Sequence, residues 1–242
     1  MNVVLAHARA QTLELARYPA YVVPTLLFPA AFFLVFAAPA DRAGAAAELA
    51  TFAGFAALGV AFFQFGVGIA ADRASPWEAY LRTLPVAPRA RLGARTLAAV
   101  PFALAASAAV VAAGLATTEA ALPAVGWLEL ALVLTLGTVP FAMLGIALGF
   151  LAPPRAALPI ANLFYLGLSY AGGLWQRPSR LPAAVAAVSP YVPTRAFGDV
   201  LAAVATGQPF TPAPWARLAA FAGGFALLAL WAYRRDEGRS YR

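Results

Sequence analysis

The sequence contains no cysteine, no lysine and a single histidine, His7, among its 242 residues. Without cysteine the chain can form neither a disulfide nor a thiolate metal site. A phosphate-binding loop needs a lysine and a zinc hydrolase motif needs two histidines, so both motifs are excluded. A serine hydrolase triad would need a histidine within the apolar part of the chain. We therefore expect no catalytic residue, no metal site and no cofactor in this chain.

Charge is also scarce. Charged residues make up 11% of the chain and hydrophobic residues 62%, whereas a soluble domain carries about 25% charged residues. A soluble fold of this length could not bury so much apolar surface. All 17 basic residues are arginine, and most of them flank hydrophobic runs. That placement is typical of membrane topology and not of nucleic-acid binding, so we predict an integral protein of a lipid bilayer.

Long hydrophobic runs are the main feature that the sequence does contain. An α-helix needs about 20 apolar residues to cross the ~30 Å core of a bilayer. The runs are continuous and not alternating, which predicts helices and not strands. We predict an all-α membrane protein whose single transmembrane domain covers residues 1–242. Its six predicted spans are residues 20–38, 49–71, 96–116, 127–152, 158–175 and 215–233.

The arginines also predict the orientation. With six spans both termini lie on one side of the membrane, and that side would carry twelve arginines against five on the other. The arginine-rich side is expected to be cytoplasmic. No charged region with a cleavage site precedes the first span, so we expect no removable signal peptide. Both termini are therefore predicted to be cytoplasmic.

Two segments are neither spans nor simple loops. Residues 1–19 place His7, Gln11 and Glu14 on one helical face, which predicts an amphipathic helix along the membrane interface. Residues 176–214 contain seven prolines and two short apolar stripes. Because proline breaks helices, we predict an extracellular re-entrant pair of short helices before the last span.

The loop at residues 72–95 is the most charged part of the chain, with five arginines and two acids. Ser75 and Pro76 are suited to begin a helix there, and Trp77 begins an apolar face with helical spacing. This loop would lie in the cytoplasm. Its helix either lies flat on lipid headgroups or docks on a cytoplasmic partner.

A few polar and aromatic residues lie within the predicted spans. Gln64 lies in the second span and Asn162 in the fifth, and such groups usually face protein or a water-filled path. Interhelical hydrogen bonds and packing would explain them, and so would the lining of a path for an apolar substrate. Gly145 and Gly149 form a small-xxx-small pair, which predicts close helix packing.

Three motifs occur in a defined order along the chain. The first is Phe28-Pro29, within the first span. The second, in the charged loop, comprises Asp72-Arg73, Glu78, Leu81, Leu84, Pro85-Val86, Arg89, Arg91 and Arg95. The third, before the last span, comprises Ser189, Pro190, Tyr191, Pro193, Thr194 and Asp199. With these motifs the chain resembles, over essentially its whole length, the permease subunits of ABC-2 type ABC transporters. It departs from them at Ser75-Pro76-Trp77, where the family commonly has a glycine-rich sequence.

The resemblance implies a half-transporter in a bacterial cytoplasmic (inner) membrane. The chain would export a substrate as a homodimer, or together with a related permease. ATP and Mg²⁺ would bind to separate nucleotide-binding subunits. The residues implied to couple the chain to that ATPase subunit are Trp77, Glu78, Leu81, Arg82, Leu84 and Pro85. The family's path runs between the two permeases along spans two and five, and the candidate lining residues here are Phe55, Phe62, Gln64, Asn162 and Tyr165.

Two other functions stay open at this point. A heme-export-like permease of cytochrome assembly also has six spans and no ATPase domain. A membrane scaffold without transport activity could use the same charged loop to hold a cytoplasmic partner. The apolar spans would suit a drug, a lipid, a peptide or a glycan, so they predict no substrate.

Overall fold

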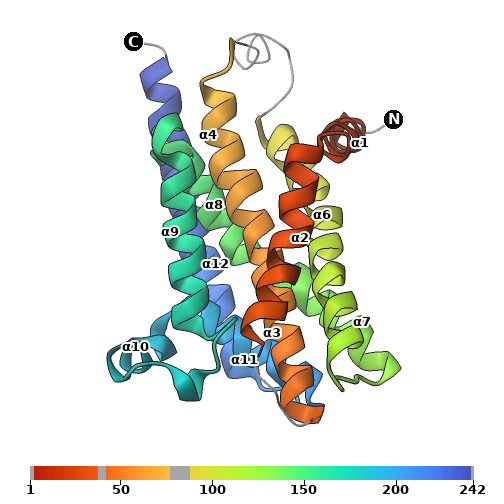
Figure 1. The fold of residues 1–242 in the computed structure, drawn as a ribbon. Coiled ribbons are helices and arrows are strands. Elements are labelled where there is room, and N and C mark those ends of the chain that lie inside the picture. The colour runs from red at the N-terminus through yellow and green to blue at the C-terminus, as the bar shows by residue number, and fades with distance from the viewer. Residues whose placement is uncertain (1–2, 38–41, 77–87, 241–242) are drawn as a thin grey trace.

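The computed structural model describes residues 3–37, 42–76 and 88–240, and every regular element in these ranges is helical. Most helices run along one direction and form an elongated bundle (Figure 1). Helix α1 and the last turns of α12 lie at the same end of this bundle, and α10 and α11 lie at the other. We call these the loop end, to which residues 77–87 attach, and the α11 end.

The first two helices are separated by a short turn at Arg17 and Tyr18. Helix α1, Val3–Ala16, runs across the bundle at its loop end and contacts α6 (Figure 1). It lies within the predicted interfacial helix 1–19. Helix α2, Pro19–Phe36, begins with proline at its first position, where the missing N–H breaks no helical hydrogen bond.

The predicted second span forms the centre of the bundle. It consists of α3 (Arg42–Val60), the π-helix η1 (Ala61–Val67) and α4 (Gly68–Arg73), which follow one another without a break. Of its most apolar 18 residues, 83% are buried. Four of its phenylalanines therefore pack inside the protein and do not face lipid: Phe52, Phe55, Phe62 and Phe65 are all at most 2% exposed.

The remaining long helices surround this centre. They are α6 (Pro88–Thr117), α7 (Ala124–Gly137), α8 (Val139–Leu151), α9 (Pro154–Gly172) and α12 (Pro212–Ser240). The fourth predicted span contains both α7 and α8, because the helix is interrupted at Thr138. Pro140 lies two residues after Thr138, and its nitrogen carries no hydrogen to donate to the preceding turn.

Five helical stretches in the described ranges are long and apolar enough to cross a membrane. They are Pro19–Phe36, Gly44–Arg73, Leu92–Thr117, Ala124–Leu151 and Pro212–Glu237. The fifth predicted span, 158–175, forms most of α9, which runs along the bundle (Figure 1) but is not among these five. The all-α, multi-pass membrane fold is thus confirmed, and the count of six spans stays a prediction.

The α11 end is built by the segment that was predicted to be re-entrant. It contains two short α-helices, α10 (Ala183–Val188) and α11 (Pro193–Ala205), with the 3-10 turns η2 (Pro178–Arg180) and η3 (Ser189–Tyr191). Helix α11 contacts α3, α7, α9 and α12. Phe197 and Leu201 on α11 are fully buried, so this helix closes the bundle at that end.

Candidate functional site

The charged loop predicted to couple the protein to a partner lies only partly within the described structure. The six predicted coupling residues, Trp77, Glu78, Leu81, Arg82, Leu84 and Pro85, lie outside the described residues. The two helices that carry this loop are described: α4 ends at Arg73 and α6 begins at Pro88. The site is therefore built from the residues at the root of the loop.

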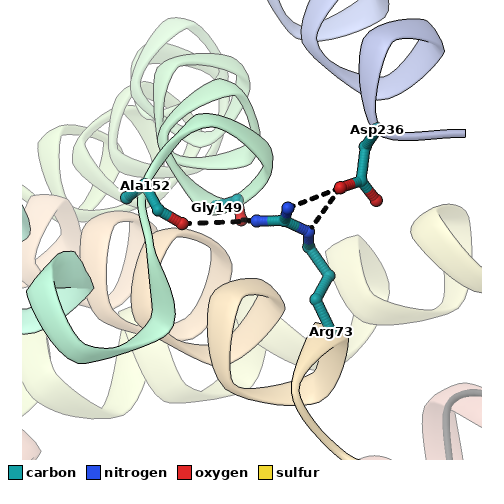
Figure 2. Close-up of polar contacts among 4 residues, drawn as sticks. All are labelled: Arg73, Gly149, Ala152 and Asp236. Atoms are coloured by element: carbon teal, nitrogen blue, oxygen red, sulfur yellow. Dashed lines mark hydrogen bonds and ion pairs between the residues drawn. The ribbon is translucent and has the colours of Figure 1, made fainter. Parts of the chain in front are cut away.

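Arg73, the last residue of α4, joins three helices at this root (Figure 2). Its Nε and Nη2 donate to Oδ1 of Asp236 on α12, at 2.9 and 2.5 Å. Its Nη1 donates to the carbonyl oxygens of Gly149 and Ala152, at 3.0 and 3.3 Å. The Arg73 and Asp236 side chains are only 20% and 10% exposed, so the pair is largely shielded from water.

The position of these two carbonyls explains why an arginine is suited to this place. Helix α8 ends at Leu151, and the last four carbonyls of a helix have no partner within it. The negative end of the helix dipole also favours a cation there. The planar guanidinium of Arg73 thus caps α8 with one edge and binds the carboxylate of α12 with the other.

A second ion pair closes the loop on its other side. Arg95 on α6 donates from Nη2 to the Asp72 carboxylate on α4. Asp72 and Arg73 are neighbours in sequence, yet they bind opposite sides of the bundle, α6 in one case and α8 with α12 in the other. Both ends of the loop are therefore fixed to the helical bundle before residues 77–87 begin.

The sequence pointed to Asp72-Arg73 as a motif but did not reveal these partners. Asp236 had no assigned role, although an acid directly after Arg234 and Arg235 in the basic tail was a usable signal. The carbonyls of Gly149 and Ala152 carry no sequence signal, because every residue has one. In the described ranges no group of three His, Asp or Glu residues could hold a metal ion.

The predicted path residues are brought together only in part. Phe55 on α3 stacks on Tyr165 of α9, with ring centroids 4.6 Å apart and an interplanar angle of 11°. Gln64 in η1 instead accepts a hydrogen bond at Oε1 from the Tyr21 hydroxyl of α2, at 3.3 Å. Phe62 is fully buried and Asn162 is half-buried. The stack joins the second and fifth predicted spans inside one copy of the chain, whereas the predicted path runs between two copies.

The Phe55–Tyr165 stack belongs to a larger group of rings near α2 and α9. We call this group the aromatic cluster, and its members are Phe28, Phe32, Phe36, Phe55, Tyr165, Tyr170 and Trp175. Trp175, which follows α9, lies 5.1 Å from Phe32 between ring centroids and 5.6 Å from Phe36. Phe28 and Phe36 are each 45% exposed, so one side of the cluster is open to the surroundings.

Two members of this cluster, and Gln64 of η1, carry buried polar atoms without partners. The Tyr165 hydroxyl, the Trp175 indole N–H and Nε2 of Gln64 are buried and lack a hydrogen-bond partner in the described structure. Such an atom costs about 1–3 kcal/mol. Buried unpaired polar groups are rare in native proteins and call for an explanation such as strain or function.

The π-helix η1 lies against α8 at very short range, through the backbone at Ala61 and Phe65. A Cβ atom added to Gly145 would lie 2.6 Å from the Ala61 carbonyl oxygen, and one on Gly149 would lie 2.7 Å from that of Phe65. The close packing predicted for this glycine pair is therefore confirmed. π-helical turns are rare and often occur at functional sites, so η1 is a further feature of the candidate path.

No protein-family model matches the chain. The chain is similar to a curated protein of Bacillus subtilis strain 168 named "Putative transport permease YvfS". The two are 24% identical over 205 residues, which cover 82% of this chain and 84% of that protein. Together with the multi-span helical fold, this similarity supports a membrane transport permease.

Proposed function

We propose that the chain is the permease subunit of an ABC-2 type exporter in a bacterial cytoplasmic membrane. Energy comes from ATP and Mg²⁺ bound to a separate nucleotide-binding subunit, and the chain itself supplies no catalytic residue. The observation that carries the proposal is the double anchor at the root of the charged loop, Asp72 to Arg95 and Arg73 to Asp236. A loop that only lay on lipid would not need this connection to four helices.

The anchors suggest how force would pass from the ATPase subunit to the bundle. Residues 77–87 dock on that subunit and move when it closes on nucleotide. Arg73 carries the movement to the end of α8 and to α12, while Asp72 carries it to α6. Helix α4 continues into η1 and α3, so the movement reaches the centre of the bundle without crossing a flexible joint.

The path of the substrate follows from the aromatic cluster. Two copies of the chain face each other, and the open side of the cluster lines the space between them. Phe55, Phe62, Gln64 and Tyr165 are buried within one copy, so they join the path only when α2 and α9 move apart. The unpaired hydroxyl of Tyr165 would then be available to a substrate.

The experiment is reconstitution of the full chain with its ATPase subunit in liposomes. We expect Glu78→Ala and Leu81→Asp to leave membrane insertion intact and to abolish the ATPase activity that the permease stimulates. Glu119→Ala is the matched control, because Glu119 is an exposed acid in the turn between α6 and α7. Unchanged stimulation in both coupling variants would show that the loop does not dock on the ATPase.

A further inference from the structure

An apolar pocket lies between α3 with η1, α6, and α7 with α8, and none of the predicted path residues lines it. It has a volume of about 450 Å³ when its open mouth is included. Its floor consists of buried side chains from all three sides: Val60, Ala61, Phe65, Ala99, Leu134 and Ala142. Val139 at its edge is 41% exposed, so the pocket opens sideways from the bundle.

The walls of this pocket favour hydrocarbon over a polar ligand. Its three polar side chains are Thr96, Thr135 and Thr138. Each hydroxyl donates to a carbonyl one turn earlier in its own helix, at 2.9, 2.8 and 2.5 Å respectively. These hydroxyls have no proton left to offer a ligand. Their oxygens can still accept a hydrogen bond, but every other wall residue has an apolar side chain.

The pocket lies at the depth of lipid tails. Val60 precedes the end of α4 at Arg73 by 13 residues, which corresponds to about 20 Å along a helix. Thr138 lies in the middle of the candidate span Ala124–Leu151. The pocket thus extends from Thr96, next to Arg95 at the loop root, to Thr138, and because the hydrocarbon core is about 30 Å thick, it lies along the half of the core nearer the loop end.

Two irregular helices create the space. The π-helix begins at Ala61, and Thr138, the single residue that separates α7 from α8, lines the same pocket. The lining also includes Ala99, Ala103 and Ala142, where larger side chains would fill the gap. An unfilled gap would deprive these walls of dispersion contacts. A second copy would reach the floor only with a large side chain placed at this mouth, whereas a flexible lipid tail of the surrounding bilayer can enter it.

We infer that this pocket binds a segment of the acyl chain of a membrane lipid, held against the start of η1. The site is independent of the proposed ATPase docking, since it requires only the bilayer. It would make the geometry of the central helix responsive to the lipid tails around it. The ligand class is an unbranched hydrocarbon chain, and the headgroup takes no part in binding.

The experiment uses the full chain in nanodiscs that contain phosphatidylcholine with a diazirine in the middle of one acyl chain. After illumination, mass spectrometry locates the crosslinked residues. We expect crosslinks concentrated at Ala103, Thr138 and Val139. Leu128 on the outer face of α7 is 65% exposed and reports contact with bulk lipid. An even distribution over the pocket and Leu128 would overturn the inference.

Two variants sharpen this test. Ala103→Phe fills the pocket and should reduce crosslinking at Thr138 to the level seen at Leu128. Ala105→Phe is the control, because Ala105 is an exposed residue of the same helix and should leave crosslinking unchanged. If Ala103→Phe does not fold, the distribution of crosslinks on the unmodified chain still tests the inference.

The alternative occupant is a second copy of the chain, which a cysteine variant detects. The chain has no cysteine of its own, so Val139→Cys introduces a single thiol at the mouth of the pocket. We expect this variant to form no disulfide-linked dimer under oxidising conditions in non-reducing gels. A disulfide-linked dimer would show that another copy covers the mouth, and the acyl-chain site would then be rejected.

Discussion

The anchor at Arg73 makes a prediction whose size follows from its contacts. Arg73→Ala removes two donors to Asp236 and two donors to the end of α8. Breaking a fully buried ion pair costs about 3–5 kcal/mol, and breaking an exposed one costs about 0–1 kcal/mol. Arg73 is 20% exposed, so we expect a loss of about 2–3 kcal/mol, between these limits but nearer the buried one.

The assay is thermal unfolding of the full chain in nanodiscs, arranged as a double-mutant cycle. A loss of about 2 kcal/mol corresponds to a fall in Tm of roughly 4–8 °C on the scale for soluble chains of this size. Asp236→Ala removes the ion pair but leaves the α8 cap in place, so it should destabilise the protein less than Arg73→Ala. The coupling energy between the two changes should be about 1–3 kcal/mol.

The same variants test whether the anchor transmits force. In the reconstituted transporter that carries Arg73→Ala, the ATPase subunit should still hydrolyse ATP but little substrate should be exported. The loop still docks in this variant but no longer moves α8 and α12. Arg73→Lys keeps the charge but lacks the planar fork that reaches both partners, so it should restore only part of the stability and coupling. A wild-type Tm for Arg73→Ala, with no coupling energy to Asp236, would refute this reasoning.

Two further predictions concern the contacts of the central helix. Gly145→Ala should destabilise the protein by about 1–3 kcal/mol in thermal unfolding, because the new methyl group would lie 2.6 Å from the Ala61 carbonyl oxygen. Gly167→Ala is the control and should not destabilise the protein, because its added methyl group meets nothing within 4 Å. Equal Tm values for the two variants would contradict the close packing. Phe55→Ala should lower the free energy of unfolding by about 3–5 kcal/mol, because it leaves a cavity beside Tyr165. Tyr165→Phe keeps the stack and removes an unpaired hydroxyl, so its Tm should be unchanged or slightly higher. A large loss of stability in Tyr165→Phe would reveal a partner for that hydroxyl.

Much of the fold was predictable because the local composition of a segment shows whether it forms a membrane helix. The five candidate spans all overlap predicted spans, since a run of apolar residues is sufficient to place a helix in lipid. The first and last residues of each helix were less predictable. The second span was predicted at 49–71, but its helix extends from Arg42 to Arg73, because a helix can continue past the apolar run that hydropathy detects.

The candidate site was predictable only where residue type was informative. Gln64 and Asn162 stood out as polar groups inside apolar runs, and they are buried and half-buried respectively. The partner of Gln64 was not evident: Tyr21 lies 43 residues from Gln64 in sequence, and nothing in its local sequence marks the contact. The π-helix that carries Gln64 was also missed, because η1 is a mostly apolar segment that continues directly from α3 into α4, and hydropathy does not distinguish a π-helix from an α-helix.

The sequence by itself determined that this is a helical, multi-pass membrane protein with a charged loop after the second span. Hydropathy, proline and charge act over one or two helical turns, so they can be read directly from the order of residues. Only the tertiary structure decided that Arg73 caps α8 and binds Asp236, which is 163 residues away in sequence. It also decided that η1 and the break at Thr138 line the same apolar pocket. Both arrangements depend on how separate helices pack, and packing is set by contacts between distant residues that no local pattern records.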